Sequence, residues 1–219
     1  MYTKPRYSLK DMVLWTRLDT LLFFVIASVP VVLYQIMGLE WLHLPWLPIA
    51  LIGTAVAFII SFQNNATYDR VWEARKIWGG IVNASRAWGV MVKDFVTNER
   101  AEEKASDAEL AGIHRELILR HVAWLTALRH AMRQARPWEQ HLRTKTNREW
   151  AEKIGVRERL HTLEEELEPY LAEEERAELD AKSNKPTQIL SQQSTRLREL
   201  KLRGLIEDFR HMEMENVLV

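Results

Sequence analysis

The stretch SFQNNATYDRVWEARKIWGG, residues Ser61 to Gly80, joins an apolar segment to a charged one. The charge-free run that precedes it ends at Phe62, and the first charged residue after it is Asp69. Trp72 and Trp78 lie among the charges that follow. Trp side chains favour the boundary between lipid and water because they have an apolar ring and a polar N–H. The stretch therefore predicts a helix that leaves a membrane and continues into water.

Two apolar runs lie upstream of this junction. Leu21–Leu39 reads LLFFVIASVPVVLYQIMGL, and Trp41–Phe62 reads WLHLPWLPIALIGTAVAFIISF, with only Glu40 between them. A bilayer core about 30 Å thick needs about 20 apolar helical residues, so each run is long enough to span it. The alternatives are a buried helix pair of a soluble protein or a secretory signal peptide. Charge-free runs of this length are rare in soluble folds, and a signal peptide is not followed at once by a second run.

The charges that flank the two runs predict their orientation. Four basic residues precede the first run, three follow the second run closely, and the connection around Glu40 has none: Lys4, Arg6, Lys10, Arg17, then Arg70, Arg75, Lys76. The positive-inside rule then places both ends of the chain in the cytoplasm and the connection outside. We expect a multi-pass protein of the cell inner membrane, anchored at the outer interface by Trp41 and Trp46. The expected domains are a cytosolic segment 1–20, a transmembrane helical hairpin 21–63 and a cytosolic helical region 64–219.

Composition narrows the function. Among 219 residues, Lys and Arg together number 30, as do Asp and Glu, so the formal net charge is zero. Nucleic-acid binders usually carry a basic excess, so we expect no nucleic-acid partner. The sequence has no cysteine, which excludes disulfides, thiolate metal sites and cysteine nucleophiles. It has no HExxH, no phosphate-binding glycine loop and no G-x-S-x-G, so we expect neither an enzyme nor a cofactor or metal site.

The region after the junction is predicted to be helical. Ser106 and Glu109 form the pattern of a capping box, so a helix begins there and ends before Pro137. A second helix is expected over Trp150–Leu167 and a third over Thr187–Arg203, with Gly204 just past its end. Two acidic runs, around Glu165 and Glu174, are typical of solvated helix surface, with a cation site as the alternative. The expected fold class is all-α.

Three residues of the second run recur with helical spacing. Thr54, Phe58 and Phe62 are separated by four residues each and so share one face of a helix. From the residues alone, ordinary helix packing is the interpretation that we favour for this face.

The segment FQNNATYDRVWEARKIWGGIVNASR, Phe62 to Arg86, is similar to the signature of the bestrophin family in its bacterial form. LDTLLFFVIASVP near the start and RGLIEDFRHMEMENVLV at the end are further matches. The resemblance implies a subunit of a homopentameric ion channel, with membrane helices that continue into a cytosolic helical body and one pore on the axis. Eukaryotic members conduct anions under calcium control, and bacterial relatives are associated with sodium. We therefore expect passage of monovalent cations rather than chloride.

The resemblance also assigns residues. It implies an apolar pore neck at Thr54, Phe58 and Phe62, although the polar Thr54 departs from the pattern of the family. It implies a second, cytosolic constriction within residues 187–190, for which Ile189 is the expected side chain. Asn64 and Asn65 are candidates for a hydrated vestibule, with ordinary helix-surface hydrogen bonding as the alternative.

The family continues past the segment FRHMEMENVLV with further membrane helices, which this sequence, ending at Val219, does not contain. The calcium site of eukaryotic members draws on that later part, so the sequence gives no support to calcium gating. A membrane-anchored helical scaffold or a non-conducting shortened subunit is the alternative to a channel.

Overall fold

A computed structural model describes residues 8–43, 45–101, 103–134, 136, 143–155 and 157–218. Every regular element in these residues is a helix, which confirms the all-α prediction. The elements are α1 (Leu9–Met37), the 3-10 helix η1 (Glu40–Leu42), α2 (Trp46–Phe95), α3 (Asp107–Arg133), α4 (Lys145–Ile154), α5 (Arg157–Leu160), α6 (Leu163–Leu167), α7 (Glu173–Asp180), α8 (Lys185–Leu202) and α9 (Asp208–Leu218). The chain divides into two compact units, Met1–Ala74 with Pro137–Val156, and Arg75–Arg136 with Arg157–Val219.

The first unit contains α1, η1, α4 and the first part of α2. α1 begins at Ser8, whose hydroxyl accepts a hydrogen bond from the backbone N–H of Asp11 (3.1 Å). It passes through Pro30 and ends at Gly38, which has a φ of 67°. Both α1 and α2 are long and apolar enough to cross a membrane, and the most apolar part of each is fully uncovered. This uncovered apolar surface agrees with the prediction of two membrane spans.

A short segment far along the chain, α4, packs against the beginning of α1. Three side-chain hydrogen bonds join the two helices. Trp15 Nε1 donates to Asn147 Oδ1 (3.0 Å), and Arg17 Nη2 donates to Glu149 Oε2 (2.6 Å). Lys153 Nζ donates to Asp11 Oδ1 (2.6 Å). These contacts place residues 143–155 with the first unit, which the sequence did not predict.

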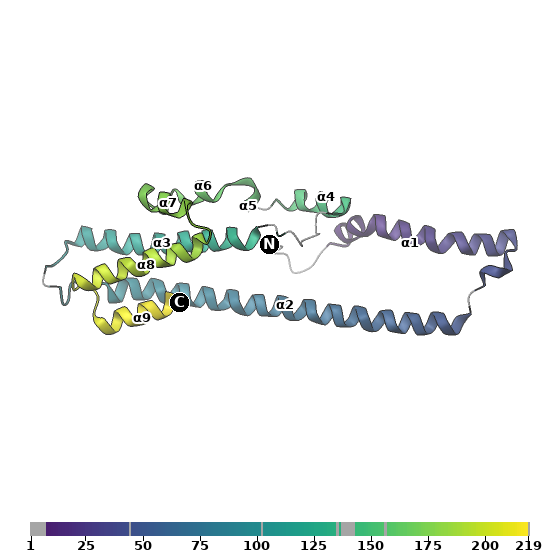
Figure 1. Cartoon of the computed structure of the whole chain (residues 1–219), viewed down its shortest axis with the longest axis horizontal. Helices are drawn as coiled ribbons and strands as arrows, with labels where there is room; N and C mark the ends of the chain where they lie inside the picture. Colours follow the sequence, from purple (N-terminus) through teal and green to yellow (C-terminus); the bar gives the residue numbers. More distant parts are fainter. Residues whose placement is uncertain are drawn as a thin grey trace. The chain divides into compact units, whose positions relative to one another are not determined.

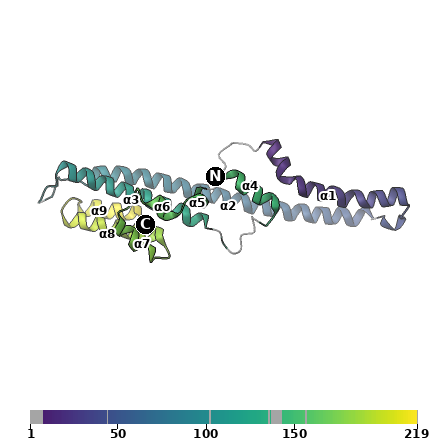
Figure 2. The same cartoon turned by 90° about the horizontal axis from the view of Figure 1, so that it is seen from above.

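The second unit is built on the end of α2 and on α3, with α8 packed along α3 in both views (Figures 1 and 2). Its larger core joins buried side chains of α2, α3, α8 and α9, among them Trp88, Val92, Leu117, Leu197, Leu200 and Met214. A smaller core lies under α6 and α7 and contains Ala123, Ala127, Leu167, Leu171, Leu179 and Ile189. Burial of these apolar side chains is what holds the short helices in place.

The start of α3 confirms the prediction at Ser106, whose hydroxyl accepts from the N–H of Glu109 (3.2 Å). α3 ends at Arg133, while Pro137 lies outside the described residues. The predicted single helix over Trp150–Leu167 is wrong. Gly155 ends α4 with a φ of 58°, and Thr162 starts α6 with a complete capping box to Glu165.

The two acidic runs lie at the first turns of α6 and α7. Glu165 accepts from the N–H of Thr162 (3.0 Å), and Glu175 accepts from the N–H of Ala172 (3.3 Å). Carboxylates at a helix N-terminus are favoured by the unpaired N–H groups and by the helix dipole. The acidic runs therefore stabilise the N-terminal ends of α6 and α7.

The end of α8 shows why glycine is required at position 204. Gly204 donates to the carbonyl of Lys201 (2.9 Å) and Leu205 to that of Leu200 (3.0 Å), the two bonds of a Schellman motif. Gly204 has a φ of 75°, as this motif requires. Leu205 then accepts from the N–H of Thr97 (2.9 Å), so the turn fixes the residues just after α2.

Candidate functional site

The three residues predicted to form a pore neck lie on one uninterrupted helix, α2. Their spacing of four residues puts them on a single face. Phe58 is 62% exposed and Phe62 is 70% exposed, and Thr54 is exposed as well. The Thr54 hydroxyl donates to the Ala50 carbonyl of its own helix (2.9 Å). Because this bond uses its only hydrogen, Thr54 presents its methyl group and an acceptor oxygen rather than a donor.

The described residues leave both phenylalanines exposed, so removing these side chains from water needs something outside this part of the chain. Burying a Phe side chain contributes about 1.5–3 kcal/mol relative to leaving it in water. Lipid, a second subunit or a narrow pore each remove such a face from bulk water. The geometry of the face therefore fits a membrane or an assembly and does not fit a free soluble surface.

The helical register separates the two asparagines predicted for a vestibule. With about 100° per residue, Asn65 lies about 20° from the direction of Phe58, whereas Asn64 lies about 120° away. Both residues are exposed. Asn65 thus continues the stripe of Phe58 and Phe62, and Asn64 belongs to a different face of α2.

Ile189 does not occupy an exposed position. It lies in the first turns of α8, where its side chain is 1% exposed and packs in the smaller core of the second unit. A constriction residue must present its side chain to an opening between subunits. The burial of Ile189 does not fit the role predicted for it, whereas Thr187 in the same turn is exposed.

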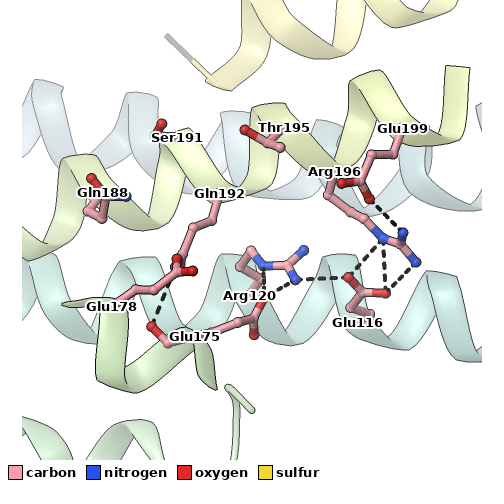
Figure 3. Close-up of a pocket in the computed structure, with 10 residues that line it drawn as sticks. All are labelled: Glu116, Arg120, Glu175, Glu178, Gln188, Ser191, Gln192, Thr195, Arg196 and Glu199. Atoms are coloured by element: carbon pink, nitrogen blue, oxygen red, sulfur yellow. Dashed lines mark hydrogen bonds and ion pairs between the residues drawn. The ribbon is translucent and has the colours of Figure 1, made fainter. Parts of the chain in front are cut away.

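A buried arginine that the sequence analysis missed lies at the centre of the second unit (Figure 3). Arg120 of α3 is 5% exposed. Its guanidinium donates to Glu116 Oε1 (2.8 Å), to Gln193 Oε1 (3.2 Å) and to Glu175 Oε1 (3.1 Å from Nε). Gln193 in turn donates to the Leu117 carbonyl (2.9 Å). A buried charge is tolerated only when it is paired and hydrogen-bonded, and this one is.

An open cavity of about 380 Å³ borders this network, as the close-up shows (Figure 3). Its walls come from α3, α7 and α8 and are formed by Glu116, Arg120, Glu175, Glu178, Gln188, Ser191, Gln192, Thr195, Arg196 and Glu199. Arg196 bridges Glu116 (3.0 Å) and Glu199 (2.9 Å), so the acidic groups are largely engaged by the two arginines. In the described parts of the chain, no group of three or more His, Asp or Glu side chains is arranged to hold a metal ion. The hydrogen bonds and ion pairs around Arg120 and Arg196 thus connect α3, α7 and α8.

His121 of α3 lies between two tryptophans, with its ring stacked on Trp88 (5.9 Å) and tilted against Trp124 (5.2 Å). Its Nε2 is 2.9 Å from the hydroxyl of Ser85, and that hydroxyl donates to the Ile81 carbonyl (2.7 Å). Because the Ser85 hydrogen is already used, the hydroxyl must accept from Nε2–H, which assigns the tautomer of the neutral ring. Burial lowers the pKa of His121 below its ordinary value of 6.5.

The fold is shared with solved membrane proteins. A variant of a bacterial bestrophin homologue from Klebsiella pneumoniae matches with a TM-score of 0.69 and 23% identity, over 93% of this chain and 62% of that one. A second Klebsiella pneumoniae variant matches with a TM-score of 0.66 and 24% identity. At this level of identity the likeness shows the fold.

Curated relatives match over shorter stretches. A voltage-dependent anion channel-forming protein of Ralstonia nicotianae is 38% identical over 104 residues, which cover 43% of this chain and 31% of that protein. A protein of the same description from Mesorhizobium japonicum is 45% identical over 51 residues, 22% of this chain and 16% of that protein. The chain thus aligns with less than a third of either relative. The family model described as bacterial/fungal bestrophin protein matches residues 5–219, so the chain belongs to the bacterial and fungal bestrophin family.

Proposed function

We propose that this chain is a subunit of a membrane ion channel, a pentamer in which α2 of each copy lines a common axis. The observation that carries the proposal is the exposed stripe of Thr54, Phe58 and Phe62 on a helix able to span a membrane. Membership of the bestrophin family and the channel-forming descriptions of the curated relatives support it. We place both ends of the chain in the cytoplasm, below the cell inner membrane.

The stripe acts as an apolar gate in this proposal. Rings of Phe side chains around an axis form a narrow, uncharged constriction, from which water withdraws when it is tight enough. An ion then loses its hydration shell without receiving ligands in return, and conduction stops. Small rearrangements that widen the ring restore water and current. Asn65, on the same stripe, is placed at the hydrated mouth below the neck.

The sign of the permeant ion does not follow from the neck, since Thr and Phe carry no charge. The family resemblance points to sodium, and the relatives from Ralstonia and Mesorhizobium are described as anion channel-forming. We propose monovalent ions as the substrate class, with sodium as the preferred ion.

Current through the purified chain in a planar bilayer under an NaCl gradient tests the proposal. A reversal potential near that of sodium supports a cation channel, and one near that of chloride supports an anion channel. Silence after incorporation has been verified, for example by fluorescence of a labelled chain, contradicts channel activity. A membrane-anchored scaffold, in which the stripe faces lipid, is then the better account.

A further inference from the structure

The stripe of the neck continues below Phe62 to a charged residue. With about 100° per residue and Phe58 as reference, Thr54 and Phe62 lie about 40° to either side, and Asp69 lies about 20° from the centre. Asp69 is the first charged residue of α2. At about 1.5 Å of rise per residue, it lies about 10 Å below the Phe62 ring. An ion that leaves the neck on this side therefore meets Asp69 before any other charge of the helix.

The next charged residues of α2 lie farther from the centre of the stripe than Asp69 does. Arg70 lies about 120° from the centre of the stripe, and Glu73 lies about 60° from it. The Asp69 side chain is exposed, and no hydrogen bond or ion pair joins it to another residue in the described part of the chain. None of the residues that the structure describes therefore pairs with this carboxylate.

The outer end of the spans also carries an acid and no base. Between Asp19 and Asp69 the sequence contains one charged residue, Glu40, which begins η1 between the two spans. Glu40 is exposed. The nearest formal charge on each side of the apolar segment of α2 is therefore a carboxylate, Glu40 before it and Asp69 after it.

We propose that Asp69 is the residue that selects for cations, by forming a ring of carboxylates at the cytosolic mouth of the neck. The proposal rests on the channel function proposed above. An uncharged neck leaves the sign of the ion to the nearest fixed charges. An ion that leaves the neck passes through this ring. Close to the carboxylates, within the screening length of about 8 Å at physiological salt, a cation is attracted and an anion is repelled.

The test is the ratio of sodium to chloride permeability, measured from reversal potentials under an NaCl gradient. We expect Asp69→Asn to lower the ratio about fivefold, because several carboxylates act on one ion as it passes through the ring. Asp69→Lys should invert the preference, and Asp69→Glu should keep it. Asp19→Asn, the same substitution on an exposed residue of α1, should leave the ratio unchanged.

The outcomes separate this proposal from the function on which it rests. A silent parent chain overturns both. A conducting parent chain that prefers chloride, or an unchanged ratio in Asp69→Asn and Asp69→Lys, overturns the role of Asp69 and leaves the channel standing. If Asp69→Asn does not assemble, the comparison of Asp69→Lys with Asp69→Glu decides the question, since these two differ in the sign of the charge.

Discussion

At the scale of single residues, two phenylalanines carry the proposed gate. We expect Phe58→Ala and Phe62→Ala to raise single-channel conductance roughly twofold or more, because loss of the ring widens the constriction and lets water remain. Phe23→Ala is the matched control, since Phe23 is also exposed (67%) but lies on α1. Recordings in planar bilayers measure the effect. Unchanged current in both α2 variants, or an equal rise in Phe23→Ala, would remove these side chains from the pore.

His121 gives a prediction on pH. Its folded-state pKa lies below 6.5, so the unfolded chain binds more protons in the window between the folded-state pKa and 6.5. The His121 contribution to stability is therefore present above pH 6.5 and declines as the pH falls through that window. In His121→Gln, which keeps a donor for Ser85 but does not titrate, the thermal midpoint should depend less on pH between about 7.5 and 5.5.

The exposed His161 supplies the control for this measurement. His161→Gln is the matched substitution, because it makes the same change of residue type at an exposed position outside the stack of Trp88, His121 and Trp124. If His121→Gln and the parent chain lose stability in parallel as the pH falls, other groups are responsible.

At the scale of elements, the turn after α8 depends on one glycine. A Cβ on Gly204 would lie 3.2 Å from the Ala101 Cα and the Arg100 carbonyl oxygen, and its φ of 75° disfavours any other residue. We expect Gly204→Ala to destabilise the folded protein by about 1–3 kcal/mol. Gly112→Ala on α3 should instead stabilise by about 0.5–1 kcal/mol, because that position is open and helical. Denaturant titration measures the free energy of unfolding of both variants. A change in the same direction for Gly204→Ala and Gly112→Ala would contradict the role of the positive φ at Gly204.

The existence of the long helices could be predicted from the sequence, whereas the short helices could not. The limits of the first two were not predicted, because α1 already begins at Leu9 and α2 continues to Phe95. Charge-free runs, the cap at Ser106 and the glycine after α8 are local signals, and all three are confirmed by the structure. The segment 145–180 lacks a long apolar period, and its breaks depend on the positive φ of Gly155 and on the cap at Thr162. Burial of Ile189 and Arg120 depends on which helices meet, which no local pattern specifies. One feature of the sequence could have indicated the burial of Arg120: it lies three residues after Leu117, on the apolar face of α3.

At the scale of the whole molecule, orientation in the membrane can be measured directly. The chain has no cysteine, so a single introduced one is a specific reporter. Glu40→Cys should react with a membrane-impermeant maleimide in intact cells, because the positive-inside rule puts this connection outside. Asp208→Cys, on the exposed surface of α9, should react only after the cells are permeabilised. Labelling in the reverse order would invert the topology and place the Asp69 side of the neck outside the cell.

The contacts between α1 and α4 also impose a waiting time while the chain is being made. Trp15 and Asn147, like Arg17 and Glu149, are 132 residues apart. A ribosome that adds about 5–20 residues per second needs roughly 7 to 26 seconds to make the partners that α1 lacks. During that interval Trp15 and Arg17 lack the partners that α4 provides. The beginning of α1 therefore gains its partners from a segment that is synthesised after both α1 and α2.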